Sequence, residues 1–406
     1  MKILFLTLAK ITTLEERGIY TDLLRKFRDA GDEIYVVSPI ERREKQTTNL
    51  VKEGNVEILR VKTLNIQKVK LIEKGLATLT IEHLFLRAIK TYFSDIKFDL
   101  VLYSTPPITF TKVISYVKKK DDAYSYLLLK DIFPQNAVDI KMIRKNSLIH
   151  RFFLAKEKKL YQVSDTIGCL SPANYDFLFQ HNRWLTKEKV EVNPNTIEPI
   201  TLNYSVIQKQ EIITKYNLPE NKRIFVYGGN LGKPQGLEFL LETIAECKEE
   251  KAFFLIVGSG TEYEKINTWF QTNQPTNAKL LKGLPKNDYD LLLSACEVGL
   301  VFLHKDFTIP NFPSRLLSYL EMKMPVISAT DPNTDIGDVI EQYQCGYKVL
   351  SGDGIAIQNA IKALCHDEEK FAIMKENAWQ LLQKEYTVEK SYQLIANRFN
   401  SKSSNV

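Results

Sequence analysis

Short apolar runs alternate with turns and amphipathic stretches along the first half of the chain. Leu23, Leu24 and Phe27 fall on one face of a predicted helix over residues 20–30. A repeated order of strand and helix predicts an open parallel sheet with right-handed crossovers. The predicted strands cover residues 2–9, 33–38, 56–61, 100–103, 124–129 and 166–170.

A second series of the same kind begins after a polar connector near residues 196–222. Its predicted strands cover residues 223–227, 253–257, 278–282, 298–302, 325–328 and 346–349, and its predicted helices cover 237–247, 262–270 and 289–295. The last helical pattern, 368–398, is long enough to return to the first series. We therefore predict an α/β protein with two Rossmann-like domains facing a central cleft: residues 1–200, with a C-terminal helix at about 385–400 packed back on them, and residues 201–384.

Composition excludes several classes of protein. A chain of 406 residues with 44% hydrophobic and 26% charged residues has ordinary globular composition, which argues against disorder and collagen. No apolar run approaches 18 residues, and the first residues resemble a buried strand more than a signal peptide, so we expect a cytoplasmic protein. The five cysteines form no Cys-x-x-Cys pair, which favours buried thiols over disulfides or a zinc site.

The net charge of +6 is unevenly distributed, because residues 1–200 carry +9 and the remainder carries −3. The basic residues are not interleaved with a nucleic-acid recognition module, so we expect no nucleic-acid partner. Segments 68–93 and 140–160 mix apolar and basic residues, and the second has the character of a helix on a membrane surface. A core-packed helix with a solvated basic face explains the same pattern equally well.

Two glycine-rich segments follow predicted strands of the second series. Tyr227-Gly-Gly-Asn-Leu-Gly-Lys-Pro-Gln-Gly236 precedes an apolar helix, so its backbone amides, the helix dipole and Lys233 suit a phosphate or diphosphate. Val257-Gly-Ser-Gly260 follows the next strand and would border the same crevice. A tight turn without a ligand is the alternative for both segments.

The segment Ile309-Pro-Asn-Phe-Pro-Ser-Arg-Leu-Leu-Ser-Tyr-Leu-Glu321 reads as a loop followed by a helix. Ser314 suits the N-cap, and Ser318 and Glu321 share its stripe of the helix. With Arg315, that stripe could hold ribose hydroxyls and a diphosphate, although a solvated helix face is the alternative. Asp288-Tyr-Asp290 spells the Asp-x-Asp of metal-dependent transferases, but helix capping explains these acids better.

The chain resembles retaining glycosyltransferases of the GT-B, family-4 type, in particular the capsule and O-antigen branch that includes N-acetylfucosaminyl transferases. The two glycine-rich segments and the 309–321 segment carry the resemblance in the second half. Asp131-Ile-Phe-Pro-Gln-Asn-Ala-Val-Asp139, Leu170-Ser-Pro-Ala-Asn174 and Asn193-Pro-Asn195 carry it in the first half. The resemblance implies a donor domain in the second half, an acceptor domain in the first, no cofactor and no metal.

By this resemblance and the motif chemistry, each domain receives a set of candidate residues. The donor-binding candidates are Gly228, Gly229, Asn230, Lys233, Gly236, Gly258, Gly260, Ser314, Arg315, Ser318 and Glu321, and the acceptor-binding candidates are Gly18, Tyr20, Ser104 and Asp131. Lys233 and Arg315 are the candidates for stabilising the leaving diphosphate, and Asp131 for orienting or deprotonating the acceptor hydroxyl.

The chain departs from the broad family at five positions. Asn230 and Gln235 stand where the family has Arg and Lys, Pro310 and Ser318 where it has paired glutamates, and Lys130 where it often has His. Lys233 and Arg315 are the cations that could replace the first pair, and Glu321 could take over the ribose contact.

By this resemblance, we expect a retaining glycosyltransferase that moves a sugar, an N-acetylated amino sugar, from a UDP-sugar to a polyprenyl-diphosphate-linked saccharide in bacterial capsule or O-antigen biosynthesis. We expect it to lie peripherally on the inner face of the cell membrane. The alternatives are a UDP-sugar epimerase on the same fold and a catalytically inactive scaffold of a polysaccharide-assembly complex.

Overall fold

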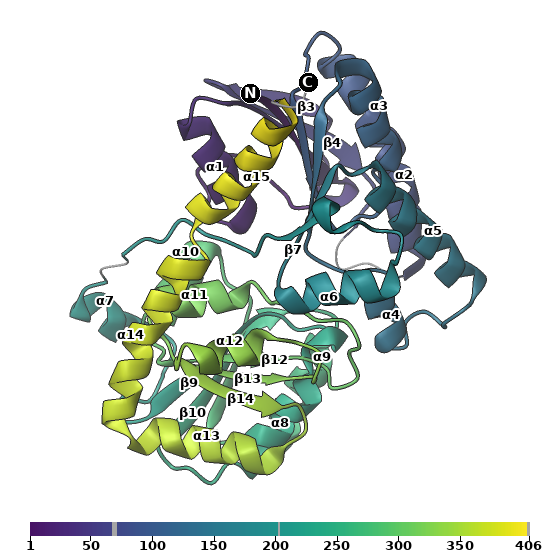
Figure 1. Cartoon of the computed structure of the whole chain (residues 1–406). Helices are drawn as coiled ribbons and strands as arrows, with labels where there is room; N and C mark the ends of the chain where they lie inside the picture. Colours follow the sequence, from purple (N-terminus) through teal and green to yellow (C-terminus); the bar gives the residue numbers. More distant parts are fainter. Residues whose placement is uncertain (67–70, 202–203, 404–406) are drawn as a thin grey trace. The chain divides into compact units, whose positions relative to one another are not determined.

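The computed structural model describes residues 1–66, 71–201 and 204–403, which form two compact α/β units (Figure 1). The first unit comprises Met1–Glu198 and Val388–Val406, and the second comprises Pro199–Thr387. The beginning of the predicted amphipathic segment 68–93, residues 68–70, lies outside the described residues.

The described part of the first unit contains an eight-stranded sheet in the order β3-β4-β2-β1-β5-β6-β7-β8. Its strands are β1 (Lys2–Leu6), β2 (Glu33–Glu41), β3 (Asn49–Glu53), β4 (Val56–Thr63), β5 (Leu100–Ser104), β6 (Tyr124–Leu129), β7 (Thr166–Cys169) and β8 (Val190–Val192). Neighbouring strands are parallel except for β3 and β4. The six predicted strands are confirmed with small changes at their ends, but the sequence did not predict β3 and β8.

Helices α1 and α15 cover one face of this sheet (Figure 1). Leu24 and Phe27 of α1 are fully buried, as predicted, and Ile395 of α15 joins the same core. The Phe27 ring lies 4.8 Å from the Tyr392 ring, which fixes the two helices against each other. The helices of this unit are α1 (Ile19–Asp29), α2 (Leu71–Tyr92), α3 (Thr111–Asp121), α4 (Gln135–Asp139), α5 (Leu148–Val163), α6 (Pro172–His181) and α15 (Val388–Ser403).

The described part of the second unit contains a six-stranded parallel sheet in the order β11-β10-β9-β12-β13-β14. Its strands are β9 (Arg223–Asn230), β10 (Ala252–Ser259), β11 (Ala278–Lys282), β12 (Val298–Phe302), β13 (Val326–Thr330) and β14 (Gly346–Leu350). Its helices are α7 (Val206–Lys215), α8 (Leu237–Glu246), α9 (Tyr263–Asn273), α10 (Lys286–Leu293), α11 (Arg315–Glu321), α12 (Ile336–Gln342), α13 (Gly354–His366) and α14 (Glu368–Glu385). All six predicted strands are present, and burial along nearly the whole length of β10, β12 and β13 explains the continuous apolar runs of these three.

The predicted helix 368–398 is in fact two helices. Helix α14 ends at Glu385 in the second unit, and α15 begins at Val388 in the first. The backbone N–H of Val388 donates to the carbonyl of Ile197. This bond joins the start of α15 to the end of the Met1–Glu198 segment of the first unit. The prediction that a C-terminal helix returns to the first unit is confirmed.

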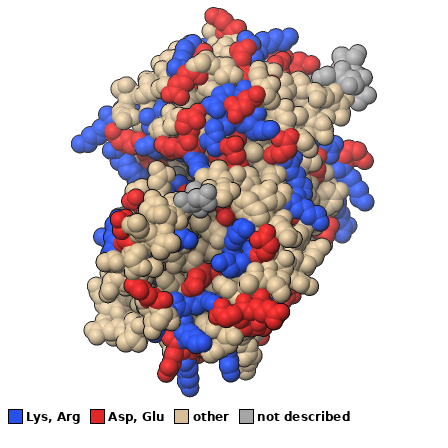
Figure 2. Space-filling model, turned by 90° about the vertical axis from the view of Figure 1, so that its left-hand side faces the viewer, with Lys and Arg blue, Asp and Glu red and all other residues tan. Residues whose placement is uncertain are grey.

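None of the five cysteines is in a disulfide, and only Cys247 is not fully buried. No helix among the described residues combines the length and the apolar character that crossing a membrane requires. On the face drawn in Figure 2, Lys and Arg side chains lie among Asp and Glu side chains, so this face carries no extended region of one sign.

Candidate functional site

The first glycine-rich segment, residues 227–236, begins within β9, and only the part after Asn230 forms a loop. Gly228, Gly229 and Asn230 belong to β9 and pair with residues 257–259 of β10, so the loop is shorter than the sequence predicted. After Leu231 and Gly232, a 3₁₀ turn covers Lys233–Gln235 and leads directly to α8. Gly236 is the N-cap of α8, and the Lys233 side chain is exposed to solvent.

Gly258 and Gly260 allow the backbone of β9 and its following loop to approach the end of β10. A Cβ atom on Gly258 would lie 2.1 Å from the carbonyl oxygen of Gly229, and one on Gly260 would lie 2.2 Å from that of Leu231. Any side chain at these positions would push the glycine-rich loop away from the sheet. Close backbone packing therefore accounts for both glycines without a ligand.

Arg315, the first residue of α11, lies beside the end of β9. Its guanidinium stacks over the ring of Tyr227 at 4.4 Å, and its Nη2 donates to the side-chain oxygen of Gln235. Its Nη1 is buried and has no hydrogen-bond partner among the described residues. Burial opposes the charge, but the nearby tyrosines Tyr227 and Tyr319 raise the pKa of Arg315, so the guanidinium stays protonated. A half-buried guanidinium with one unpartnered N–H group is suited to an anionic ligand.

The sequence did not predict the contacts of Tyr319 with Gly228 or of Gln235 with Arg315. Tyr319 accepts a hydrogen bond from the backbone N–H of Gly228 at 3.1 Å and donates to the carbonyl of Leu300 at 3.3 Å. The amide of Gly228 is therefore used inside the protein. The one feature of the sequence that could have indicated a role for Tyr319 is its position directly after the candidate residue Ser318 on α11.

The predicted polar stripe of α11 is divided in the structure. Ser314 is exposed and makes no side-chain cap hydrogen bond, Ser318 is half-buried, and Glu321 is 7% exposed. A carboxylate oxygen of Glu321 accepts a hydrogen bond from the backbone N–H of Ile200 at 3.0 Å. Glu321 thus has a structural contact within the second unit.

The Asp288-Tyr-Asp290 segment lies in α10. Asp288 is in the first turn, where its charge favours the helix, but Asp290 is buried and forms an ion pair with Lys286 rather than capping the helix. The part of the chain that the structure describes contains no group of three or more His, Cys, Asp or Glu side chains placed to hold a metal ion.

In the first unit, the predicted acceptor residues come together at the carboxyl edge of the sheet. Gly18 is the N-cap of α1, and its N–H donates to Asp22 at 3.0 Å. Burial raises the pKa of Tyr20, and a hydrogen bond with Ser104, at the end of β5, partly offsets that rise. The hydroxyl of Thr105 accepts hydrogen bonds from the backbone N–H groups of Lys130 and Asp131, which joins the ends of β5 and β6.

Asp131 is held by Asn136, whose side-chain nitrogen lies 2.7 and 2.8 Å from the two carboxylate oxygens. The neighbouring Lys130 lies with its Nζ 3.4 Å from the carbonyl of Pro194, and burial lowers the pKa of its ammonium group to about 7. An oriented carboxylate beside a lysine of low pKa can position a hydroxyl group and exchange a proton with it.

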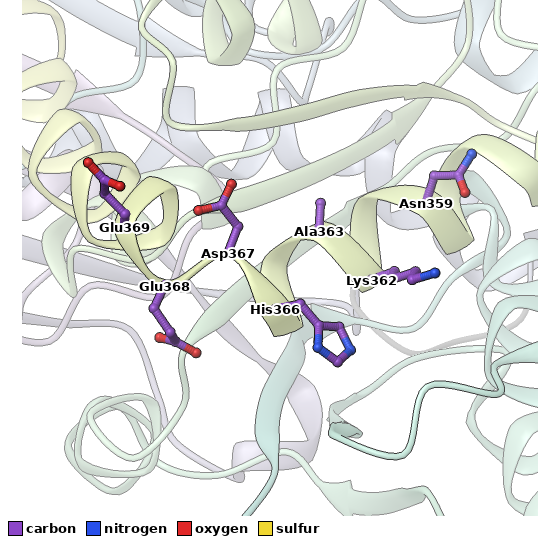
Figure 3. Close-up of a pocket in the computed structure, with 7 residues that line it drawn as sticks. All are labelled: Asn359, Lys362, Ala363, His366, Asp367, Glu368 and Glu369. Carbon is purple, nitrogen blue, oxygen red and sulfur yellow. The ribbon is translucent and has the colours of Figure 1, made fainter.

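The pocket drawn in Figure 3 lies at the junction of α13 and α14 and contains none of the predicted site residues. His366 contacts Glu249 at 2.9 Å, Asp367 caps α14 through the N–H of Lys370, and Glu368 pairs with Arg223. These three side chains thus have structural partners.

Residues 208–380, which fall in the second unit, match the family of glycosyl transferases group 1. The chain is 25% identical over 305 residues to the probable glycosyltransferase WbjE of Pseudomonas aeruginosa, covering 73% of each chain. It is 28% identical over 130 residues, 31% of each chain, to the putative colanic acid biosynthesis glycosyl transferase WcaI of Escherichia coli K12.

Solved structures show the same fold at low sequence identity. Sucrose-phosphate synthase from Thermosynechococcus elongatus superposes with a TM-score of 0.75 at 15% identity, over the full length of both chains. Anabaena HepE in complex with UDP-glucose superposes with a TM-score of 0.71 at 15% identity, over 99% of this chain and 100% of HepE. The comparisons therefore support a glycosyltransferase with the GT-B fold, in which residues 208–380 of the second unit are similar to the group 1 glycosyl transferases.

Proposed function

We propose that this glycosyltransferase moves a sugar, an N-acetylated amino sugar, from a UDP-sugar to a lipid-linked saccharide during assembly of a surface polysaccharide. The similarity to WcaI, a putative colanic acid biosynthesis glycosyl transferase, supports the polysaccharide pathway. The HepE structures with UDP and UDP-glucose support the nucleotide. The observation that carries the proposal is Arg315, a half-buried arginine beside the glycine-rich loop whose buried Nη1 has no hydrogen-bond partner among the described residues.

In the proposed reaction, the bond between the anomeric carbon and the β-phosphate oxygen breaks as the acceptor oxygen attacks from the same face. This retains the anomeric configuration, and the hydroxyl proton passes to the departing phosphate oxygen. Arg315, Lys233 and the amides of the loop before Gly236 stabilise the charge that develops on the diphosphate. Asp131, held by Asn136, orients the acceptor hydroxyl.

Neighbouring side chains keep Arg315 in place for this role. The side-chain oxygen of Gln235 accepts from Arg315 and from the hydroxyl of Tyr227, the latter at 3.1 Å. The Tyr227 ring covers one face of the guanidinium. An arginine fixed before the ligand arrives needs little reorganisation when negative charge develops.

A screen of UDP-sugars against a synthetic polyprenyl-diphosphate saccharide tests the proposal. We expect one UDP-sugar to be consumed and the acceptor mass to rise by one glycosyl residue, with the configuration of the donor retained in the product. Conversion of the UDP-sugar without acceptor would instead identify an epimerase. Absence of both turnover and calorimetric UDP binding would identify an inactive scaffold.

A further inference from the structure

Large hydrophobic side chains are exposed together on α5 and on the loop before it. Leu148 is 85% exposed, Ile149 60% and Phe152 43%, and Met142 and Leu154 are also exposed. Five of the thirteen exposed large hydrophobic side chains among the described residues therefore fall within residues 142–154. Single exposed hydrophobic residues are ordinary, but a contiguous group marks an interaction surface.

Helix α5 also has a buried face, so the exposed side chains belong to a helix that is packed on its unit. Glu157, Leu160 and Tyr161 lie on the inner face of α5 and are buried in the first unit. The helix start is also fixed, because Ser147 accepts from the backbone N–H of His150 at 3.2 Å. Leu148 and Phe152 therefore project from a well-anchored helix on the side away from its core contacts.

Basic residues surround these hydrophobic side chains. Residues 141–160 contain one acid, Glu157, which is buried, so the solvent side of the segment carries only positive charge. The basic residues are Lys141, Arg144, Lys145, Arg151, Lys156, Lys158 and Lys159. Apolar side chains that enter the headgroup region, flanked by lysines and arginines, are complementary to an anionic bilayer surface.

The same helix contacts the segment that carries the proposed acceptor residue. The ring of Phe153 packs on that of Phe133 at 4.9 Å, and Phe133 lies two residues after Asp131. Tyr161, on the inner face of α5, interacts electrostatically with Asp131. A surface bound at α5 would therefore lie beside the edge of the first unit that holds Asp131.

We propose that the α5 patch, the exposed side chains of residues 141–159, docks this protein on an anionic phospholipid bilayer. The proposal rests on the proposed function, since a lipid-linked acceptor is held at such a surface. Docking would bring the diphosphate and saccharide of the acceptor to the first unit without extracting the lipid from the membrane.

Flotation of the full-length protein with vesicles tests the docking directly. The vesicles are either phosphatidylcholine alone or equal parts of phosphatidylglycerol and phosphatidylcholine, without sugar acceptor. We expect the wild-type protein to float with the anionic vesicles only, and the Leu148→Ser, Ile149→Ser, Phe152→Ser triple variant to bind at least about tenfold more weakly.

The second unit offers a matched control variant. Val206, Ile207 and Ile355 are 83%, 71% and 79% exposed, so their change to Ser removes similar apolar area far from α5 in the sequence. We expect this control to float like the wild type. Equal binding by the two triple variants, or no vesicle binding by the wild type, would overturn the proposal. Self-association through α5 in light scattering, with no vesicle binding, would assign the patch to a protein partner instead.

The test of vesicle binding can fail or succeed independently of the test of sugar transfer. With an acceptor on a short, water-soluble lipid, the α5 triple variant should keep wild-type turnover, because no vesicle is needed. Vesicle binding without any transfer would leave docking in place and refute the proposed function. Transfer to the short acceptor without vesicle binding would refute docking alone.

Discussion

Glu157, on the buried side of α5, makes the stability of the first unit depend on pH. The residue is 8% exposed and accepts a hydrogen bond from the Tyr161 hydroxyl at 2.9 Å. Burial raises the pKa of its carboxyl group from 4.5 to about 7, and the Tyr161 hydrogen bond opposes that rise. Because the folded state holds the proton more tightly, stability increases as the pH falls from 7 toward 4.5 and is lost as the pH rises through 7.

The change Glu157→Gln removes this dependence and keeps an oxygen that can accept from Tyr161. The two pKa values differ by 2.5, which corresponds to about 3 kcal/mol of folding free energy at pH 8, where the carboxylate is ionised in both states. We therefore expect the variant to be more stable than the wild type by about 3 kcal/mol at pH 8. At pH 5 the advantage should be about 1 kcal/mol.

Tryptophan fluorescence during urea unfolding can measure this difference in the first unit alone. The chain has three tryptophans, and Trp184 is the one in the first unit, with Lys158 of α5 over its ring at 5.7 Å. Changing Trp269 and Trp379 to Phe makes Trp184 the single reporter, which avoids treating two units as one transition.

Glu53→Gln, at an exposed position on β3, serves as the control and should show the same small effect at both pH values. The reasoning would be refuted if Glu157→Gln gave no advantage at pH 8, or an advantage of equal size at pH 5 and pH 8.

Three further substitutions test other contacts. Gly258→Ala places a Cβ against the backbone oxygen of Gly229 and should cost about 3 kcal/mol of unfolding free energy in the second unit, measured in urea; a neutral effect would contradict the close approach. Gln235→Ala removes the acceptor that holds Arg315 and should weaken UDP binding about tenfold in calorimetry without changing the thermal midpoint; unchanged affinity would show that Arg315 needs no such support. Lys130→Met should stabilise the protein by at least about 1 kcal/mol more at pH 6.5 than at pH 9.5. Burial lowers the pKa of Lys130 to about 7, so the wild-type folded state loses stability as the pH falls from 10.5 to 7. Unfolding curves with no pH trend would contradict this.

Much of the fold could be predicted because many of its strands are buried along nearly their whole length. Such strands appear as continuous apolar runs whatever their neighbours are, as in Tyr124–Leu129. Strand β3 is at the sheet edge and only partly buried, and β8 has three residues, so neither gives that signal. The break between α14 and α15 was missed because helical sequence continues on both sides of it.

The candidate site could be predicted less completely, since its contacts join residues far apart in the chain. The motifs located the glycine-rich loop and Arg315, but not that Tyr319 uses the amide of Gly228. Nor does the sequence indicate that Glu321 turns inward to the backbone of Ile200, 121 residues away. Helical spacing assigns a residue to a stripe, but only packing decides which part of the stripe faces solvent.

The central claim is that Arg315 stabilises the leaving diphosphate of a UDP-sugar, and the second unit contains a matched control for testing it. Arg223 begins β9, the strand whose other end borders Arg315, and it too is stacked on an aromatic ring, that of Phe371, at 3.7 Å. Transfer by Arg315→Ala and Arg223→Ala should be compared with one UDP-sugar and the lipid-linked acceptor. We predict that Arg315→Ala lowers kcat about 100-fold to 1,000-fold while Arg223→Ala transfers at close to the wild-type rate. Wild-type transfer by Arg315→Ala would contradict the account.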